Sequence, residues 1–269
     1  MKVGIIGYGS MGKMLLWKFS ERRSMGKDEL FAANRTKEKL SEARDIATIC
    51  SNTESAANAD ILFVCVRPMD LKPVIEEIRD ALRPDTLLVS LNGSVGFDML
   101  EKITNRKMAK VIPSVTAEID RSQTLVCFNS LADVSDKKAL KDLLSCIGNV
   151  IELPENEMGM GSELVSCMPG FIASIFDVLC REAQKHTSIP QDQVVSMVLR
   201  TMSATSELML QNRMTFEDVV TRVATPGGIT EEGTKAVYEG FPATAATLFT
   251  NTLAKRAATA EKAQAQFLS

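Results

Sequence analysis

Residues 3–12 read VGIIGYGSMG, a short apolar run followed by three glycines in the spacing GxGxxG. An apolar run of this length is typical of a buried strand. The three glycines, in order, permit a tight turn, close approach of a pyrophosphate to the backbone, and close packing of the next helix. The N-terminus of that helix offers N–H groups to an anion. The pattern predicts a dinucleotide-binding loop made of Gly7, Tyr8, Gly9, Ser10, Met11 and Gly12.

Apolar runs and helical patterns alternate through the first half of the chain. The expected strands are residues 3–6, 30–33, 61–66, 87–91, 109–112 and 124–128. The expected helices are residues 10–22, 36–44, 69–82, 96–103 and 135–147. Short strands separated by helices indicate βαβ units and a mostly parallel sheet. The fold class is therefore α/β, with an N-terminal Rossmann-like, doubly wound sheet.

The second half is predicted to be helical. From residue 157 onward there is almost no strand pattern, and helices are expected at 191–211, 215–223 and 241–266. We expect a dinucleotide-binding domain at 1–156 and an all-helical dimerisation and substrate domain at 157–269. Residues 194–209 and 243–253 carry more apolar side chains than one copy of such a domain can bury. The sequence therefore predicts a homodimer or a higher homo-oligomer.

Composition excludes several classes of protein. The 31 Lys and Arg residues against 34 Asp and Glu residues give a net charge of −3, which argues against nucleic-acid and membrane-surface partners. A single histidine, His186, excludes multi-histidine metal sites, and no metal is expected. None of the six cysteines forms a CxxC pair, and unpaired cysteines suit a reducing cytoplasm. The start lacks the pattern of a signal peptide, so we expect a cytoplasmic protein with a small-molecule substrate.

The end of the second strand indicates which dinucleotide binds. NAD sites commonly place an acidic residue there to hold the ribose hydroxyls, but this chain has Asn34, followed by Arg35 and Thr36. With no carboxylate to repel a 2′-phosphate, Arg35 can pair with it and Thr36 can donate a hydrogen bond. The residues favour NADP(H) over NAD(H).

Val66, Arg67 and Pro68 end the third long apolar run. Ligands of open α/β sheets bind outside the carboxyl ends of such strands, so these three residues are further candidates for cofactor binding. Arg67 can face a carboxylate, the cofactor or solvent, and the sequence leaves all three open.

Several motifs, in order, resemble the pyrroline-5-carboxylate reductase family. They are the glycine loop GYGSMG, then ANRT at 33–36, VRP at 66–68, VIPSVTAEI at 111–119 and VATPGGITEEG at 223–233. The resemblance implies hydride delivery from NAD(P)H to the C=N carbon of a cyclic imine, which gives proline. It also implies a helical domain that interlocks with a second subunit. Pro113, in the fourth motif, joins the residues expected at the cofactor.

The resemblance also implies a substrate site. Thr225, Gly228 and the backbone at Ile229 would hold the substrate carboxylate, and Thr230, the catalytic candidate, would hydrogen-bond the ring nitrogen. The turn carrying them would meet the nicotinamide bound by the other subunit. Met168 stands where the family has a glycine in the substrate pocket.

Other positions also depart from the family pattern. Ser114 replaces an asparagine and Ile229 a threonine, and carboxylates lie near the motifs at Glu118 and at residues 231–232. An alternative is therefore a divergent, late-competence-type paralogue that reduces another imine or carbonyl, or a cofactor-binding regulator. A β-hydroxyacid dehydrogenase is disfavoured, because those enzymes use a lysine in the interdomain helix and residues 157–184 contain none.

Overall fold

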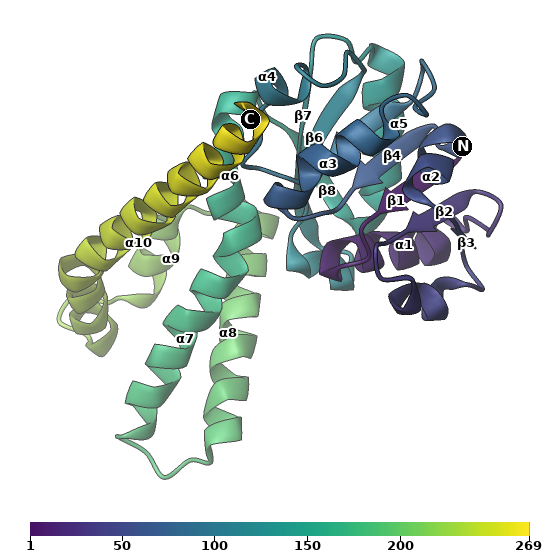
Figure 1. Ribbon diagram of the computed structural model, residues 1–269. Coiled ribbons are helices and arrows are strands. Elements are labelled where there is room, and N and C mark those ends of the chain that lie inside the picture. The colour runs from purple at the N-terminus through teal and green to yellow at the C-terminus, as the bar shows by residue number, and fades with distance from the viewer. Residues whose placement is uncertain (269) are drawn as a thin grey trace. The chain divides into compact units, whose positions relative to one another are not determined.

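The computed structural model describes residues 1–268 and contains one eight-stranded sheet (Figure 1). Its strands, in chain order, are β1 Val3–Ile6, β2 Leu30–Ala33, β3 Thr48–Ile49, β4 Ile61–Val64, β5 Leu87–Ser90, β6 Met108–Ile112, β7 Ser122–Phe128 and β8 Gly148–Glu152. The spatial order is β3-β2-β1-β4-β5-β6-β7-β8, and all neighbours are parallel except β6 and β7. This confirms the predicted doubly wound α/β sheet.

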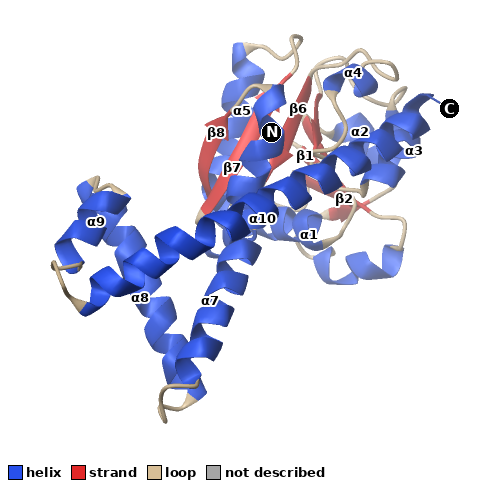
Figure 2. Ribbon diagram, turned by 90° about the vertical axis from the view of Figure 1, so that its left-hand side faces the viewer, coloured by secondary structure: helices blue, strands red, loops and turns tan. Residues whose placement is uncertain are grey.

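Helices cover both faces of the sheet (Figure 2). They are α1 Ser10–Arg23, α2 Asn52–Asn58, α3 Pro68–Ile78, α4 Phe97–Leu100 and α5 Val134–Leu144. The later helices are α6 Met158–Ser162, α7 Met168–Gln184, α8 Gln191–Asn212, α9 Phe216–Val223 and α10 Ile229–Leu268. A π-helical turn, Glu163–Cys167, joins α6 to α7.

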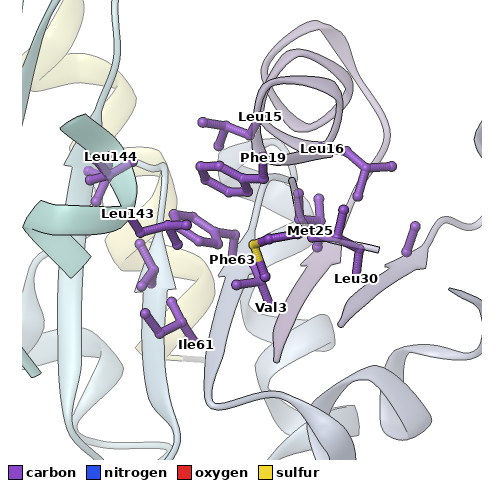
Figure 3. Packing of buried hydrophobic residues seen from close by; sticks show 14 of the residues in the cluster. Val3, Leu15, Leu16, Phe19, Met25, Leu30, Ile61, Phe63, Leu143 and Leu144 are labelled. Carbon is purple, nitrogen blue, oxygen red and sulfur yellow. The ribbon is translucent and has the colours of Figure 1, made fainter. Parts of the chain in front are cut away.

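Successive side chains of each strand point to opposite faces of the sheet, so the core has two layers. In β4, Ile61 and Phe63 pack in the layer with α1 and α5, whereas Leu62 and Val64 pack in the layer with α2, α3 and α4. Phe19 of α1 meets Phe63 with ring centroids 5.5 Å apart (Figure 3). Because both faces are covered, the strands read as continuous apolar runs rather than alternating ones.

Four sequence expectations differ from the structure. Helix α2, Asn52–Asn58, was not predicted. Residues 36–44 form a 3₁₀ helix, Lys37–Ala43, rather than an α-helix. Strands β3 and β8 were missed, because their side chains are largely exposed or half-buried and leave no apolar run. The last helix begins at Ile229, not at residue 241, and runs through Pro242. Proline usually disrupts a helix interior, which is why the pattern placed the start beside it.

Two compact units divide the chain. One holds Met1–Pro169 together with the residues from Leu253 onward, and the other holds Gly170–Thr252. The first unit includes the end of α10 because Ala263 and Phe267 are buried in the layer that contains α3. The expected boundary between residues 156 and 157 stays a prediction about where the dinucleotide domain ends.

A buried ion pair links α10 to the π-helical turn inside the first unit. Arg256 donates from Nε and Nη2 to Oε1 of Glu163, at 3.0 and 2.7 Å, and from Nη2 to Ser162 Oγ. The Glu163 side chain is 2% exposed. Two glycines lie beside the Arg256 side chain: a Cβ on Gly93 would lie 3.4 Å from its Nη1 and a Cβ on Gly159 would lie 3.5 Å from its Cδ, both ordinary contact distances. The pair lies close in sequence to both points where the chain passes between the units.

We predict that Arg256→Met lowers the free energy of unfolding by about 3 kcal/mol, because it leaves a buried carboxylate without its partner. Chemical denaturation of the two proteins measures the difference. The double variant Arg256→Met/Glu163→Leu is expected to recover most of the loss, since an apolar pair can replace a buried ion pair. Losses that simply add in the double variant would contradict this account of the pair.

Candidate functional site

Close backbone packing shapes the glycine loop after β1. Gly7 has φ +99°, and a Cβ there would lie 2.8 Å from the carbonyl oxygen of Cys65. A Cβ on Gly12 would lie 2.0 Å from the carbonyl oxygen of Gly7. Gly9 differs, because no atom lies within 4 Å of its Cβ position. Packing therefore requires glycine at 7 and 12, whereas residue 9 faces open space that a ligand can fill.

The N-terminus of α1 is prepared for an anion. Gly9 is its N-cap, no side chain among residues 1–268 caps it, and its first turn contains no acidic residue. The first-turn N–H groups and the helix dipole therefore favour a negative ligand at this point. A phosphate at a helix N-terminus is bound in this way.

A groove of about 640 Å³ lies at the carboxyl ends of β1, β2 and β4. The structure brings together there eight of the predicted cofactor residues, namely Gly7, Tyr8, Gly9, Asn34, Arg35, Thr36, Val66 and Arg67. Five others do not line it. Ser10, Met11 and Gly12 form the first turn of α1, Pro68 begins α3, and Pro113 follows β6. The groove occupies the point where the strand order reverses, which is where open α/β sheets bind ligands.

Asn34 stabilises the glycine loop through its side-chain amide. Its Oδ1 accepts a hydrogen bond from the N–H of Tyr8 at 2.9 Å, and its Nδ2 donates to the carbonyl of Thr36 at 2.8 Å. Both ends of the amide are therefore used within the protein. A ribose bound at the end of β2 would meet Arg35 and Thr36 instead.

Two ionisable groups beside the glycine loop stay neutral near pH 7. The ring of Tyr8 is buried and its Oη accepts a hydrogen bond from Trp17 Nε1 at 3.0 Å, so Tyr8 presents its backbone to the groove. Burial is the main cause that raises the pKa of the Tyr8 hydroxyl, and burial also raises the pKa of the Cys65 thiol. A neutral thiol is a poor nucleophile, which suits a groove that binds a ligand without covalent chemistry.

Sequence reasoning missed the far wall of the groove. Its residues are Lys39, Asn52, Asp70, Pro73, Val74 and Glu77, which come from the 3₁₀ helix, α2 and α3. Asn52 Nδ2 donates to Glu77 Oε2 at 2.8 Å. The VRP motif, where α3 begins, was the sequence signal for these residues. The first turns of a helix that follows a strand lie at the same edge of the sheet as the end of that strand.

The predicted substrate residues of the late turn lie in the second unit, Gly170–Thr252. Thr225 and Thr230 are exposed, and the side chain of Ile229 is almost fully exposed. Gly227 has φ +73°, and the N–H of Gly228 donates to the carbonyl of Thr225 at 2.8 Å. The N–H of Gly227 donates to Oε2 of Glu231 at 2.6 Å, so a carboxylate of the chain itself binds the turn. One N–H of the turn is therefore already paired with a carboxylate of the same chain.

The structure also locates Met168, an expected substrate residue, and Asn92, which the sequence did not single out. Met168 is half-buried and begins α7 directly after the π-helical turn. Asn92, which the sequence did not single out, follows β5 and is buried, with its Oδ1 accepting from the N–H of Ser94 and its Nδ2 unpaired within residues 1–268. An Asn-Gly-Ser turn directly after a strand is the signal that could have identified Asn92.

Comparison with known proteins gives matches along the whole chain. Residues 2–94 match the model of the family described as NADP oxidoreductase coenzyme F420-dependent, and residues 155–259 match pyrroline-5-carboxylate reductase dimerisation. Pyrroline-5-carboxylate reductase 3 of Bacillus subtilis (strain 168) is 30% identical over 258 residues, covering 94% of this chain and 95% of the relative. ComE operon protein 4 of the same organism is 27% identical over 256 residues, covering 94% of each.

Solved structures show the same fold. The pyrroline carboxylate reductase of Plasmodium falciparum with NADP bound has a TM-score of 0.82 at 22% identity, covering 99% of this chain and 98% of that one. The 1-pyrroline-5-carboxylate reductase of Streptococcus pyogenes has a TM-score of 0.85 at 19% identity, covering 96% and 98%.

Two alanine variants separate ligand contact from packing in the loop. Gly9→Ala is expected to melt at or above the wild-type temperature, because φ −85° and open space suit alanine, yet to weaken dinucleotide binding at least about 10-fold. Gly12→Ala is expected to lower the melting temperature, because its Cβ would overlap the Gly7 carbonyl. Thermal melts and NADPH titrations measure both effects. Unchanged NADPH affinity in Gly9→Ala would contradict the site.

Proposed function

Because the chain belongs to the pyrroline-5-carboxylate reductase family, we propose that it reduces 1-pyrroline-5-carboxylate to proline with NADPH. The family places it among NAD(P)-dependent oxidoreductases that act on CH–NH bonds. The choice of NADPH and of this imine goes further and is our proposal. The observation that carries the proposal is the groove above an uncapped helix N-terminus, with Arg35 and Thr36 beside it and no carboxylate at the end of β2.

The groove residues fit a nicotinamide dinucleotide. The open space at Gly9 and the free N–H groups of the first turn of α1 would hold the pyrophosphate. Arg35 and Thr36 would hold the 2′-phosphate, while Asn34 keeps the loop in place through its two hydrogen bonds. In this proposal Arg35 and Thr36 select NADPH, which carries the 2′-phosphate, whereas the space at Gly9 accommodates NADPH and NADH equally.

The proposed reaction makes little demand on acid–base side chains of the protein. When bound, the reduced nicotinamide would supply a hydride to the carbon of the protonated C=N bond. The π-electron pair of that bond then passes to the ring nitrogen, which already carries the proton, and a secondary amine results. The protein orients the two reactants. In the proposal Thr225, Gly228 and the backbone of Ile229 bind the substrate carboxylate, and the hydroxyl of Thr230 hydrogen-bonds the ring nitrogen. A chain with one histidine is compatible with this division of labour.

The second unit supports assembly into a homodimer or a larger homo-oligomer. Of residues 170–252, only Cys180 and Val194 are buried. Large apolar side chains of this unit are exposed instead, among them Val178, Leu179, Met197, Leu199, Leu210, Phe216, Val237 and Tyr238. A helical unit without its own core needs a partner surface. Residues Glu155–Gln184 are also long and apolar enough, by length and composition alone, to cross a membrane. We assign that apolar surface to the subunit interface of a cytoplasmic protein.

A second candidate function has specific support. Glu231 already occupies the turn that would bind the substrate carboxylate, and Met168 replaces the small residue that the family pattern has in the pocket. Both changes work against a small carboxylate-bearing ring. They favour a family member that reduces another imine or carbonyl, or one that binds the cofactor to regulate a partner. ComE operon protein 4 is a relative that carries no reductase name.

The direct test is NADPH oxidation by the purified protein with 1-pyrroline-5-carboxylate, with proline measured as the product. We expect turnover that is faster with NADPH than with NADH, in a sample whose mass by light scattering is at least that of a dimer. No turnover in a sample that binds NADPH would favour the second candidate, and Met168→Gly then tests whether the side chain blocks the pocket. A monomeric mass in an active sample would contradict a site shared between subunits.

The cofactor preference has its own test in Arg35→Ala. We expect NADPH to bind about 10-fold or more weakly, because a charge-assisted contact to the 2′-phosphate is lost. NADH, which lacks that phosphate, is expected to change less than about twofold. Isothermal titration calorimetry with both cofactors measures the difference. Equal losses for the two cofactors would exclude Arg35 as the residue that selects NADPH.

A further inference from the structure

Asp70 lies in the first turn of α3 and lines the cofactor groove. Its two carboxylate oxygens have different arginine partners. Oδ2 accepts a hydrogen bond from Nε of Arg67 at 3.2 Å, and Oδ1 lies 3.6 Å from Nη1 of Arg35. One carboxylate therefore holds both arginines that the sequence placed at the groove.

The two arginines come from opposite sides of the glycine loop. Arg35 follows β2 and Arg67 follows β4, and these strands flank β1 in the sheet. Asp70 thus joins the two sides of the groove through ion pairs, next to the end of β2 where an adenosine ribose would lie. In this arrangement the arginine assigned to the 2′-phosphate already has an anionic partner from the protein.

We propose that Asp70 is a specificity-determining residue that competes with the 2′-phosphate of NADPH for Arg35. The inference rests on the proposed preference for NADPH. On binding, the 2′-phosphate replaces the Asp70 carboxylate as the partner of Arg35. NADH carries no phosphate at that position, so the pair between Arg35 and Asp70 stays in place. Asp70 therefore lowers the ratio of the affinity for NADPH to the affinity for NADH.

Exposure sets the size of the effect. The side chains of Arg35 and Asp70 are 81% and 35% exposed, so water screens their attraction and the exchange of anions is easy. The 2′-phosphate and the Asp70 carboxylate, both near the Arg35 guanidinium, also repel each other. Replacing the carboxylate with an uncharged amide removes this repulsion. The effect is therefore a shift in affinity and not a loss of binding.

The test is Asp70→Asn, which keeps the side chain's size and an acceptor for Arg67. We expect NADPH to bind about 3- to 10-fold more tightly and NADH to change less than about twofold, both by isothermal titration calorimetry at low salt. The matched control is Glu76→Gln. Glu76 is an exposed residue of the same helix and carries the same charge, but it is not among the residues that line the groove. We expect Glu76→Gln to leave both affinities within about twofold.

The double variant Asp70→Asn/Arg35→Ala distinguishes exchange at Arg35 from a general effect of charge. If Asp70 acts through Arg35, the gain in NADPH affinity disappears in the Arg35→Ala background. A gain that persists there, or that Glu76→Gln reproduces, would overturn the inference. So would NADPH binding that is unchanged or weaker in Asp70→Asn. Should Arg35→Ala weaken NADPH selectively while Asp70→Asn has no effect, the proposed cofactor preference stands and the role of Asp70 alone fails.

Discussion

The first turn of α1 lies so close to the loop before it that a Cβ on Gly12 would be 2.0 Å from the carbonyl oxygen of Gly7. This contact brings the helix N-terminus to the end of β1, between the ends of β2 and β4. Gly9, the N-cap of the helix, then lines the groove, and no side chain among residues 1–268 caps the helix. Every proposed contact to a dinucleotide depends on that placement, because the phosphate site is made of backbone that no side chain could replace.

Polar side chains at the strand ends influence which dinucleotide the groove prefers, whereas the backbone forms the phosphate site. Asn34 uses both ends of its amide to fix the loop, so the residue that commonly selects NAD has become a structural one. In our proposal Arg35 selects the cofactor, and Asp70, which pairs with Arg35 at 3.6 Å, competes with the 2′-phosphate for it. A groove built this way can shift its cofactor preference through single exposed charges without changing the fold, since neither Arg35 nor Asp70 is buried.

The sequence predicted the parts of the fold in which local pattern and burial agree. The glycine loop, the alternation of most strands and helices in the first half and eight of the groove residues followed from glycine spacing, apolar runs and the residues at the ends of those runs. The start of the last helix was misplaced beside Pro242, because proline lacks the N–H that a helix interior uses, yet the helix runs without a break over Ile229–Leu268. Asp70 and the pair of Glu163 with Arg256 could not be predicted, because each depends on contacts between segments that the sequence does not place side by side.

Hydrogen–deuterium exchange with and without NADPH tests most directly whether the dinucleotide binds over the glycine loop. The account predicts slower amide exchange on NADPH addition in residues 7–13 and 34–36, because the pyrophosphate and the 2′-phosphate accept hydrogen bonds there. In Gly9→Ala the same amides should be less protected than in the wild type at the same NADPH concentration. Protection confined to other segments, with residues 7–13 unchanged, would contradict the account.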